Sequence, residues 1–139
     1  LANFAAISSP TLKRTIDTLA EDGIIEHRFL IDTPYEIDAF HLNEIAKAMT
    51  RIYNGNKVAI LSIAGLHGSI TPDARKVDTT KDNEYTLAIA LVIQELSQRL
   101  LANLYFKIKK ANYPVNIFKS EDEATEWLHQ QIRANQQTG

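Results

Sequence analysis

The sequence predicts a single α/β domain with a mixed, mostly parallel sheet and helices packed on it. Three observations support this prediction. The chain has 139 residues, which is the length of one domain. After an opening hairpin, segments of strand character alternate with segments of helical periodicity. Residues 58–64 form a continuous apolar run, as expected for a strand covered on both sheet faces. The predicted order of elements is β-β-α-β-α-β-α-β-α.

The first half of the domain is predicted to be a hairpin followed by a helix and a strand. Within residues 13–32, apolar and polar residues alternate on the carboxyl side of Gly23, which tolerates the positive φ of a tight turn. Asp38 is a good N-cap for the next helix. Gly55 is expected to end this helix, and residues 58–64 form the strand that follows.

The second half contains two further strand–helix pairs after a short helix that begins near Thr71. Residues 85–93 have the length and β-branched content of a strand, although their alanines and leucines would also permit a helix. Residues 96–108 repeat apolar side chains at every fourth position, which predicts an amphipathic helix. A short strand follows Pro114, and residues 120–133 form the closing helix.

The limits of the domain follow from the same patterns. The packed part is expected over about residues 14–133, with residues 1–10 and 134–139 as tails. Ser120 and Glu123 form a capping box at the start of the closing helix. Trp127 is expected in the core on the buried face of that helix.

Composition and charge narrow the classes of function. The formal net charge is -2 and there is no cysteine, so we expect no nucleic-acid binding, no disulfide and no thiolate chemistry. No apolar run approaches the roughly 20 residues that cross a bilayer. Residues 1–10 lack the basic start of a signal peptide. We therefore expect a cytoplasmic protein without stable membrane insertion.

The order of the elements resembles the STAS domain, named from sulfate transporters and anti-sigma-factor antagonists. A more specific similarity is to a group of bacterial STAS-like and lipid-transfer-like proteins, and it extends over residues 19–132. The segments that carry it are EDGIIEHRF (21–29), TPDARK (71–76), ALVIQELSQRLLANLYFK (90–107) and YPVNIFKSEDEATEWL (113–128).

The resemblance implies a regulatory function and a protein partner. Classical bacterial STAS proteins are phosphorylated on a serine at the start of the helix that follows the third strand. They bind a kinase or an anti-sigma factor through that region. Other relatives are similar in topology to the CRAL-TRIO lipid-transfer fold and hold apolar ligands or touch membranes. An apolar ligand is therefore the alternative that the resemblance implies.

The segment that corresponds to this phosphorylated region is residues 64–76. Here the sequence HGSIT (67–71) replaces the family pattern Asp-Ser-x-Gly, so phosphorylation is not carried over to a matching residue. Ser69 and Thr71 remain candidates for phosphorylation or anion binding near a helix N-terminus. The alternative is that Thr71 is only a helix cap and Gly68 only a turn residue. The candidate interaction surface around them consists of His67, Gly68, Arg75 and Lys76.

The leucine-rich helix over residues 96–108 has two interpretations. An amphipathic helix buries its apolar face in the core by default, and this is the interpretation we expect. The same face would otherwise line an apolar pocket or form a homodimer contact. The candidate pocket residues are Leu104, Tyr105 and Ile108.

No pattern in the sequence indicates catalysis or metal binding. The P-loop, GxGxxG, GxSxG and HExxH patterns are absent. The histidines are widely separated and are expected at the surface or partly buried: His27, His41, His67 and His129. A His67–Ser69 catalytic pair lacks an orienting acid. The acidic residues Asp73, Asp78, Asp82 and Glu84 lie among lysines and are expected to be solvated.

Together these observations predict a non-enzymatic regulatory domain of the bacterial cytoplasm. It would bind a protein partner, such as an anti-sigma factor or a kinase, with no cofactor and no metal ion. A homodimer is a further expectation. The alternative function is a carrier or sensor of a lipid or another apolar small molecule.

Overall fold

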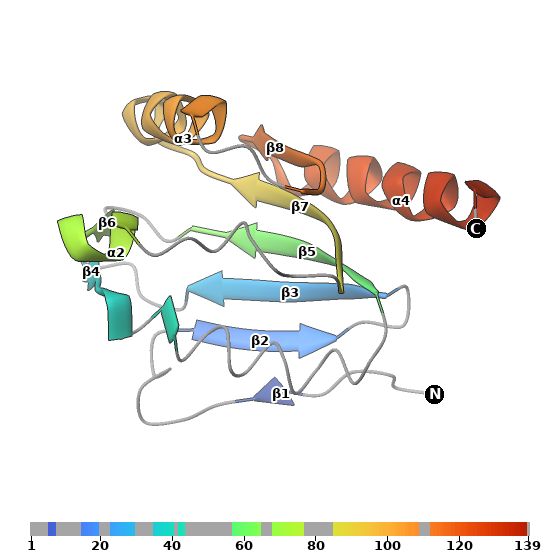
Figure 1. Ribbon diagram of the computed structural model, residues 1–139, viewed down its shortest axis with the longest axis horizontal. Coiled ribbons are helices and arrows are strands. Elements are labelled where there is room, and N and C mark those ends of the chain that lie inside the picture. Colours follow the sequence, from blue (N-terminus) through green and yellow to red (C-terminus); the bar gives the residue numbers. More distant parts are fainter. Residues whose placement is uncertain are drawn as a thin grey trace.

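A six-stranded sheet forms the centre of the structure, a computed structural model shown in Figure 1. The structure describes residues 6–7, 15–19, 23–29, 35–40, 42–43, 57–64, 68–76, 85–108 and 112–138. The strands of the sheet are β1 (Ala6–Ile7), β2 (Thr15–Leu19), β3 (Ile24–Phe29), β5 (Val58–Ile63), β7 (Thr86–Val92) and β8 (Val115–Phe118). They are arranged in the order β1-β2-β3-β5-β7-β8.

The sheet is mixed, which confirms the predicted α/β class. β1, β2 and β3 are antiparallel neighbours, whereas β3, β5, β7 and β8 run parallel to one another. The described helices are α2 (Pro72–Lys76), α3 (Leu96–Ile108) and α4 (Glu121–Thr138). Parallel neighbours require crossover connections, and the alternation of strands and helices after β3 supplies them.

The opening hairpin is confirmed in its two paired strands and in the conformation of Gly23, the described residue of its turn. β2 and β3 pair antiparallel, with Leu19 opposite Ile25 and Thr15 opposite Phe29. Gly23 has a φ of 82°, in the left-handed region that glycine adopts without a steric penalty. The sequence signal was local, because the turn residue and the alternating strand lie side by side in the chain.

A second, two-stranded sheet was not predicted. β4 (Tyr35–Ile37) and β6 (Gly68–Ile70) pair in parallel, with Glu36 opposite Ser69. Residues 68–70 were expected in a turn or loop, so this expectation is wrong. Three residues are too few to display a period of two, and the pairing depends on a partner more than 30 residues away in the chain.

The main core lies between α4 and the sheet. α4 packs against β7 and β5, where Ala59, Ala88 and Ala90 are fully buried. These small side chains let the helix approach the strands closely. Ala124 and Leu128, four residues apart on α4, fill the space above them and are also fully buried. The predicted buried face of the closing helix is confirmed for Ala124 and Leu128, whereas Trp127 is half-buried at the edge of this core.

The limits of both tails and the burial of one histidine differ from the sequence predictions. α4 continues to Thr138, so most of the expected tail 134–139 is helical. β1 lies within the expected tail 1–10 and pairs with β2. His27 is only 3% exposed, although it was expected near the surface. It lies on β3, an interior strand of the sheet, opposite Asp17 of β2 and Ser62 of β5.

Part of the predictions lies outside the described residues. The helix after Asp38 is described at residues 39, 40, 42 and 43, and its first turn is closed by the Leu42 N–H donating to the Asp38 carbonyl over 3.2 Å. The rest of that helix, including Gly55, lies outside the description. So do His41, His67, Asp78, Asp82 and Glu84.

Candidate functional site

The most distinctive surface of the described structure is the outward side of α3. Four leucines of this helix are 55–63% exposed, and we call them the leucine face: Leu96, Leu100, Leu101 and Leu104. The interpretation of this stripe as core is therefore wrong for these residues. The helical period identifies an apolar face, but it does not say which element covers that face. α3 contacts β8, the last strand of the sheet (Figure 1).

A hydrogen-bonded arginine holds α3 in this rotation. The Arg99 guanidinium Nη1 donates to the carbonyl oxygens of Ile93, over 3.1 Å, and Gln94, over 2.7 Å. These carbonyls belong to the connection between β7 and α3. Gln98, Arg99 and Ala102 are half-buried, whereas the leucines point outward. Among the described side chains of α3, the exposed face is therefore the leucine face, whereas the half-buried side chains lie on the other side.

The candidate loop begins a helix, as predicted. Thr71 caps α2, because its Oγ1 accepts a hydrogen bond from the Ala74 N–H over 3.2 Å. The Thr71 hydroxyl also donates to the Asp73 carboxylate, and this bond lowers the pKa of Asp73. A phosphate on Thr71 would stand beside that carboxylate and would be repelled by it. Phosphorylation of Ser69 or Thr71 stays a prediction, and for Thr71 it carries this electrostatic cost.

The remaining residues of the candidate loop are described in part. Lys76 is exposed at the end of α2. Gly68 and Ser69 lie in β6, and the side chains of Ser69 and Arg75 lie outside the description. Among the predicted pocket residues, Leu104 is outward on α3. The side chains of Tyr105 and Ile108 lie outside the described set.

We expect Thr71→Ala to lower the free energy of unfolding by about 1 kcal/mol, because the Ala74 N–H loses its acceptor. Urea unfolding followed by the fluorescence of the single tryptophan measures this difference. Thr71→Ser keeps a hydroxyl at the same position and should retain wild-type stability. Equal stability of all three proteins would show that the hydroxyl does not cap α2.

An ion-pair cluster joins β3 to the start of α4. The Arg28 guanidinium contacts both oxygens of the Glu121 carboxylate, with Nη2 at 2.6 Å from Oε1 and Nη1 at 3.3 Å from Oε2. It also contacts Glu26 two residues earlier on β3, with Nη2 at 3.2 Å from Oε1. Hydrogen bonds to Glu121 and then to Glu26 raise the pKa of Arg28, so the cation stays charged.

Arg28→Met should destabilise the protein by about 1 kcal/mol. The cluster is partly solvated, which limits its contribution to the free energy of unfolding. The two parallel contacts between the guanidinium and the Glu121 carboxylate place that contribution at the upper end of the range for surface ion pairs. Arg133→Met is the matched control. It removes a single 3.6 Å pair to Glu126 at a more exposed position, and we expect almost no change. Equal losses in the two variants would contradict a special contribution from Arg28.

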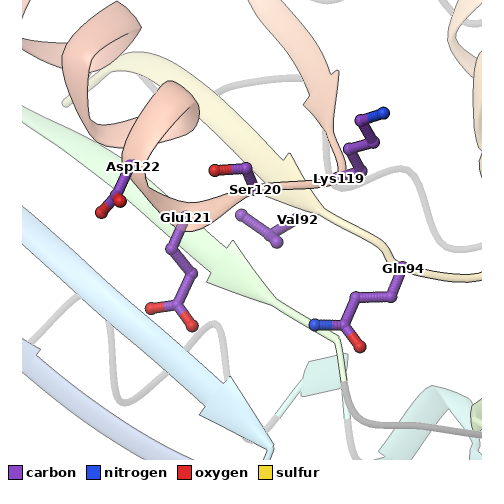
Figure 2. Close-up of a pocket in the computed structure, with 6 residues that line it drawn as sticks. All are labelled: Val92, Gln94, Lys119, Ser120, Glu121 and Asp122. Carbon is purple, nitrogen blue, oxygen red and sulfur yellow. The ribbon is translucent and has the colours of Figure 1, made fainter.

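A shallow depression lies next to this cluster, at the carboxyl ends of β7 and β8. It has a volume of about 390 Å³. Its lining residues are Val92, Gln94, Lys119, Ser120, Glu121 and Asp122. Figure 2 shows Gln94 and Lys119 on one side, and Glu121 and Asp122 on the other, with Val92 between them. In open α/β sheets, this edge is where ligands commonly bind.

The lining of the depression suits polar contacts rather than an apolar ligand. Val92 is the one apolar residue in it, and the Glu121 carboxylate is already held by Arg28. Three acidic residues occupy the first turn of α4, Glu121, Asp122 and Glu123, and they oppose an anion there. Within the described part of the chain, no group of three or more histidine or carboxylate side chains is placed to hold a metal ion.

Sequence reasoning did not single out this depression. Its residues were assigned only to a strand end and a capping box. The Ser120 Oγ does accept from the Glu123 N–H over 3.4 Å, and Ala124 N–H donates to the Ser120 carbonyl over 3.2 Å. The sequence did contain one signal for this depression, namely each place where a parallel strand is followed directly by a helix. Such a junction lies at the carboxyl edge of the sheet, where ligands commonly bind.

The structure therefore defines a small α/β domain with an outward leucine face and a polar depression at the carboxyl edge of its sheet. Residues 18–132, well over half of the chain, match the family described as Domain of unknown function (DUF7793), and the chain belongs to this family. No curated protein and no solved structure matches it. None of the described helices combines the length and apolar character needed to cross a membrane.

Proposed function

We propose that this domain is a non-catalytic regulatory domain that acts by binding another protein chain, and that the leucine face of α3 is its contact surface. The exposure of four leucines on one short helix carries this proposal. Large apolar side chains gathered on a surface mark interaction sites in soluble proteins. Full burial of one leucine side chain contributes about 1.5–3 kcal/mol, so covering this face supplies a substantial driving force.

Two further observations support a protein as the partner. Arg99 fixes the rotation of α3 by hydrogen bonds to backbone carbonyls, so the leucines are presented on a rigid element. The resemblance to STAS domains supports a regulatory role in the bacterial cytoplasm with a kinase or an anti-sigma factor as partner. The segment 67–76 is then a second part of the proposed surface, with Thr71 at its middle and Lys76 at its carboxyl end.

Carriage of an apolar small molecule is the competing function, because the same leucines would serve as one wall of its site. Mass spectrometry under native conditions separates the two. We expect the protein purified without denaturant to be bound to another protein chain, and Leu96→Ser/Leu104→Ser to release that chain. The matched control is Asn103→Ser, an exposed polar position on the same helix, which should leave the complex unchanged.

Two results would contradict the proposal. A stoichiometric apolar molecule that is lost in the leucine double variant would establish the carrier function instead. A protein complex that survives the double variant would show that the leucine face is not the contact surface. Urea unfolding of each variant checks that the exposed substitutions leave the fold intact.

A further inference from the structure

The leucine face has the spacing that a two-fold contact between identical helices requires. Leu96 and Leu104 lie four residues on either side of Leu100, which is about 6 Å in each direction along the helix. An interface across a two-fold axis must be complementary to itself. If two α3 helices run antiparallel about Leu100, Leu96 of each copy faces Leu104 of the other, and the two Leu100 side chains meet at the axis.

The charges around the leucine face fit the same arrangement. Lys107 is exposed in the last turn of α3, and the helix contains no acidic residue. In the antiparallel register about Leu100, Lys107 lies opposite residue 93 of the other copy. The next residue, Gln94, lines the depression that also contains Glu121 and Asp122. The basic end of each α3 therefore approaches the acidic depression of the other copy.

The net charge of the depression stays negative when the cations in and around it are counted. In the lining, the carboxylates of Glu121 and Asp122 outnumber the one cation, Lys119. Beside the lining, two cations (Arg28 and Arg99) are outnumbered by three carboxylates (Glu26, Glu95 and Glu123). The two Lys107 residues lie about 21 Å apart in the antiparallel pair. This separation exceeds the screening length of about 8 Å at physiological salt. A parallel pair would instead bring the two lysines together.

From this self-complementarity of shape and charge, we infer that a second copy of this chain docks on the leucine face, with the two α3 helices antiparallel across a two-fold axis. The inference rests on the proposed function, and it takes a second copy, in place of the kinase or anti-sigma factor, as the chain that covers the leucine face. The same features disfavour an anionic membrane as the occupant, because the chain is net negative and acidic residues begin the neighbouring α4.

A single cysteine at the axis tests the arrangement, because the chain has no cysteine of its own. Leu100→Cys should give a disulfide-linked dimer under mild oxidation, since the two thiols meet at the axis. Gln130→Cys, at an exposed position on α4, is the matched control and should stay monomeric. Linked dimers in both variants, or in neither, would overturn the proposed axis.

Charge reversal tests the register independently, with the dissociation constant measured by sedimentation. We expect Lys107→Glu and Asp122→Lys each to weaken the dimer about tenfold, and the double variant to return to within about threefold of wild type. Wild-type protein that sediments as a monomer overturns the second copy as partner. If Leu96→Ser/Leu104→Ser then still releases a different protein in native mass spectrometry, the proposed function stands although a second copy is not the partner. If no protein is released, the proposed function and the inferred dimer are both wrong.

Discussion

Replacement of Leu128 by alanine is expected to lower the free energy of unfolding by about 2–5 kcal/mol. Leu128 is fully buried on α4, above the alanines of β5 and β7. Those small side chains cannot move to fill the cavity, so the loss should lie in the upper half of this range. Urea unfolding followed by tryptophan fluorescence gives the value directly.

Leu101→Ala is the matched control for this prediction. It makes the same chemical change at a leucine that is 63% exposed on α3, and in protein dilute enough to leave the leucine face uncovered we expect less than about 0.5 kcal/mol. The contrast depends only on which leucine is covered. If the two variants lost similar amounts of stability, the core would not lie where α4 crosses the sheet.

Trp127→Ala is expected to have the second-largest effect, about 2–3 kcal/mol. This is below the roughly 3–5 kcal/mol of a fully buried tryptophan, because the Trp127 ring is only half-buried. Its ring contacts that of Phe118, with centroids 5.7 Å apart and planes inclined by 51°. The contact ties α4 to β8, and aromatic pairs of this geometry add to the stability gained from burial.

Circular dichroism must follow the unfolding of Trp127→Ala, since the variant loses the only tryptophan. Trp127→Phe keeps an aromatic ring against Phe118 and should recover about half of the lost stability. An alanine variant as stable as wild type would show that the pair does not hold β8 and α4 together.

The parts of the fold that sequence predicted correctly are those with local signals. The hairpin follows from Gly23 and the alternating residues after it. β7 is a strand, as residues 85–93 predicted, and its burial alternates residue by residue. α4 follows from Ser120 as cap and from Ala124 and Leu128 one turn apart. In each case the residues that determine the element lie within a few positions of one another.

Elements that depend on distant contacts were not predicted. β6 exists through its pairing with β4, and neither three-residue strand has a pattern of its own. His27 is buried on an interior strand of the sheet, whose neighbours come from two other parts of the chain. The leucines of α3 were assigned to the core because periodicity gives the direction of an apolar face, but only the packing of α3 shows that the face is left uncovered.

The candidate site was predicted to a smaller extent than the fold. Thr71 was identified as a cap, and its bond to Ala74 confirms this. The clustering of Arg28 with Glu121, 93 residues later in the chain, has no signature in the sequence. The depression at Gln94 and Asp122 was missed because its two sides come from separate strand ends, although each strand-to-helix junction was visible in the sequence.

The central claim is that the leucine face of α3 points into solvent on each chain. The reaction of a thiol reagent with Leu100→Cys, in dilute protein, tests it most directly. We predict a rate within about tenfold of that for the unfolded chain, whereas Leu128→Cys should react at least about a hundredfold more slowly, since it must wait for opening of the core. Equal slow reaction of both thiols would contradict the claim and would place Leu100 in the core.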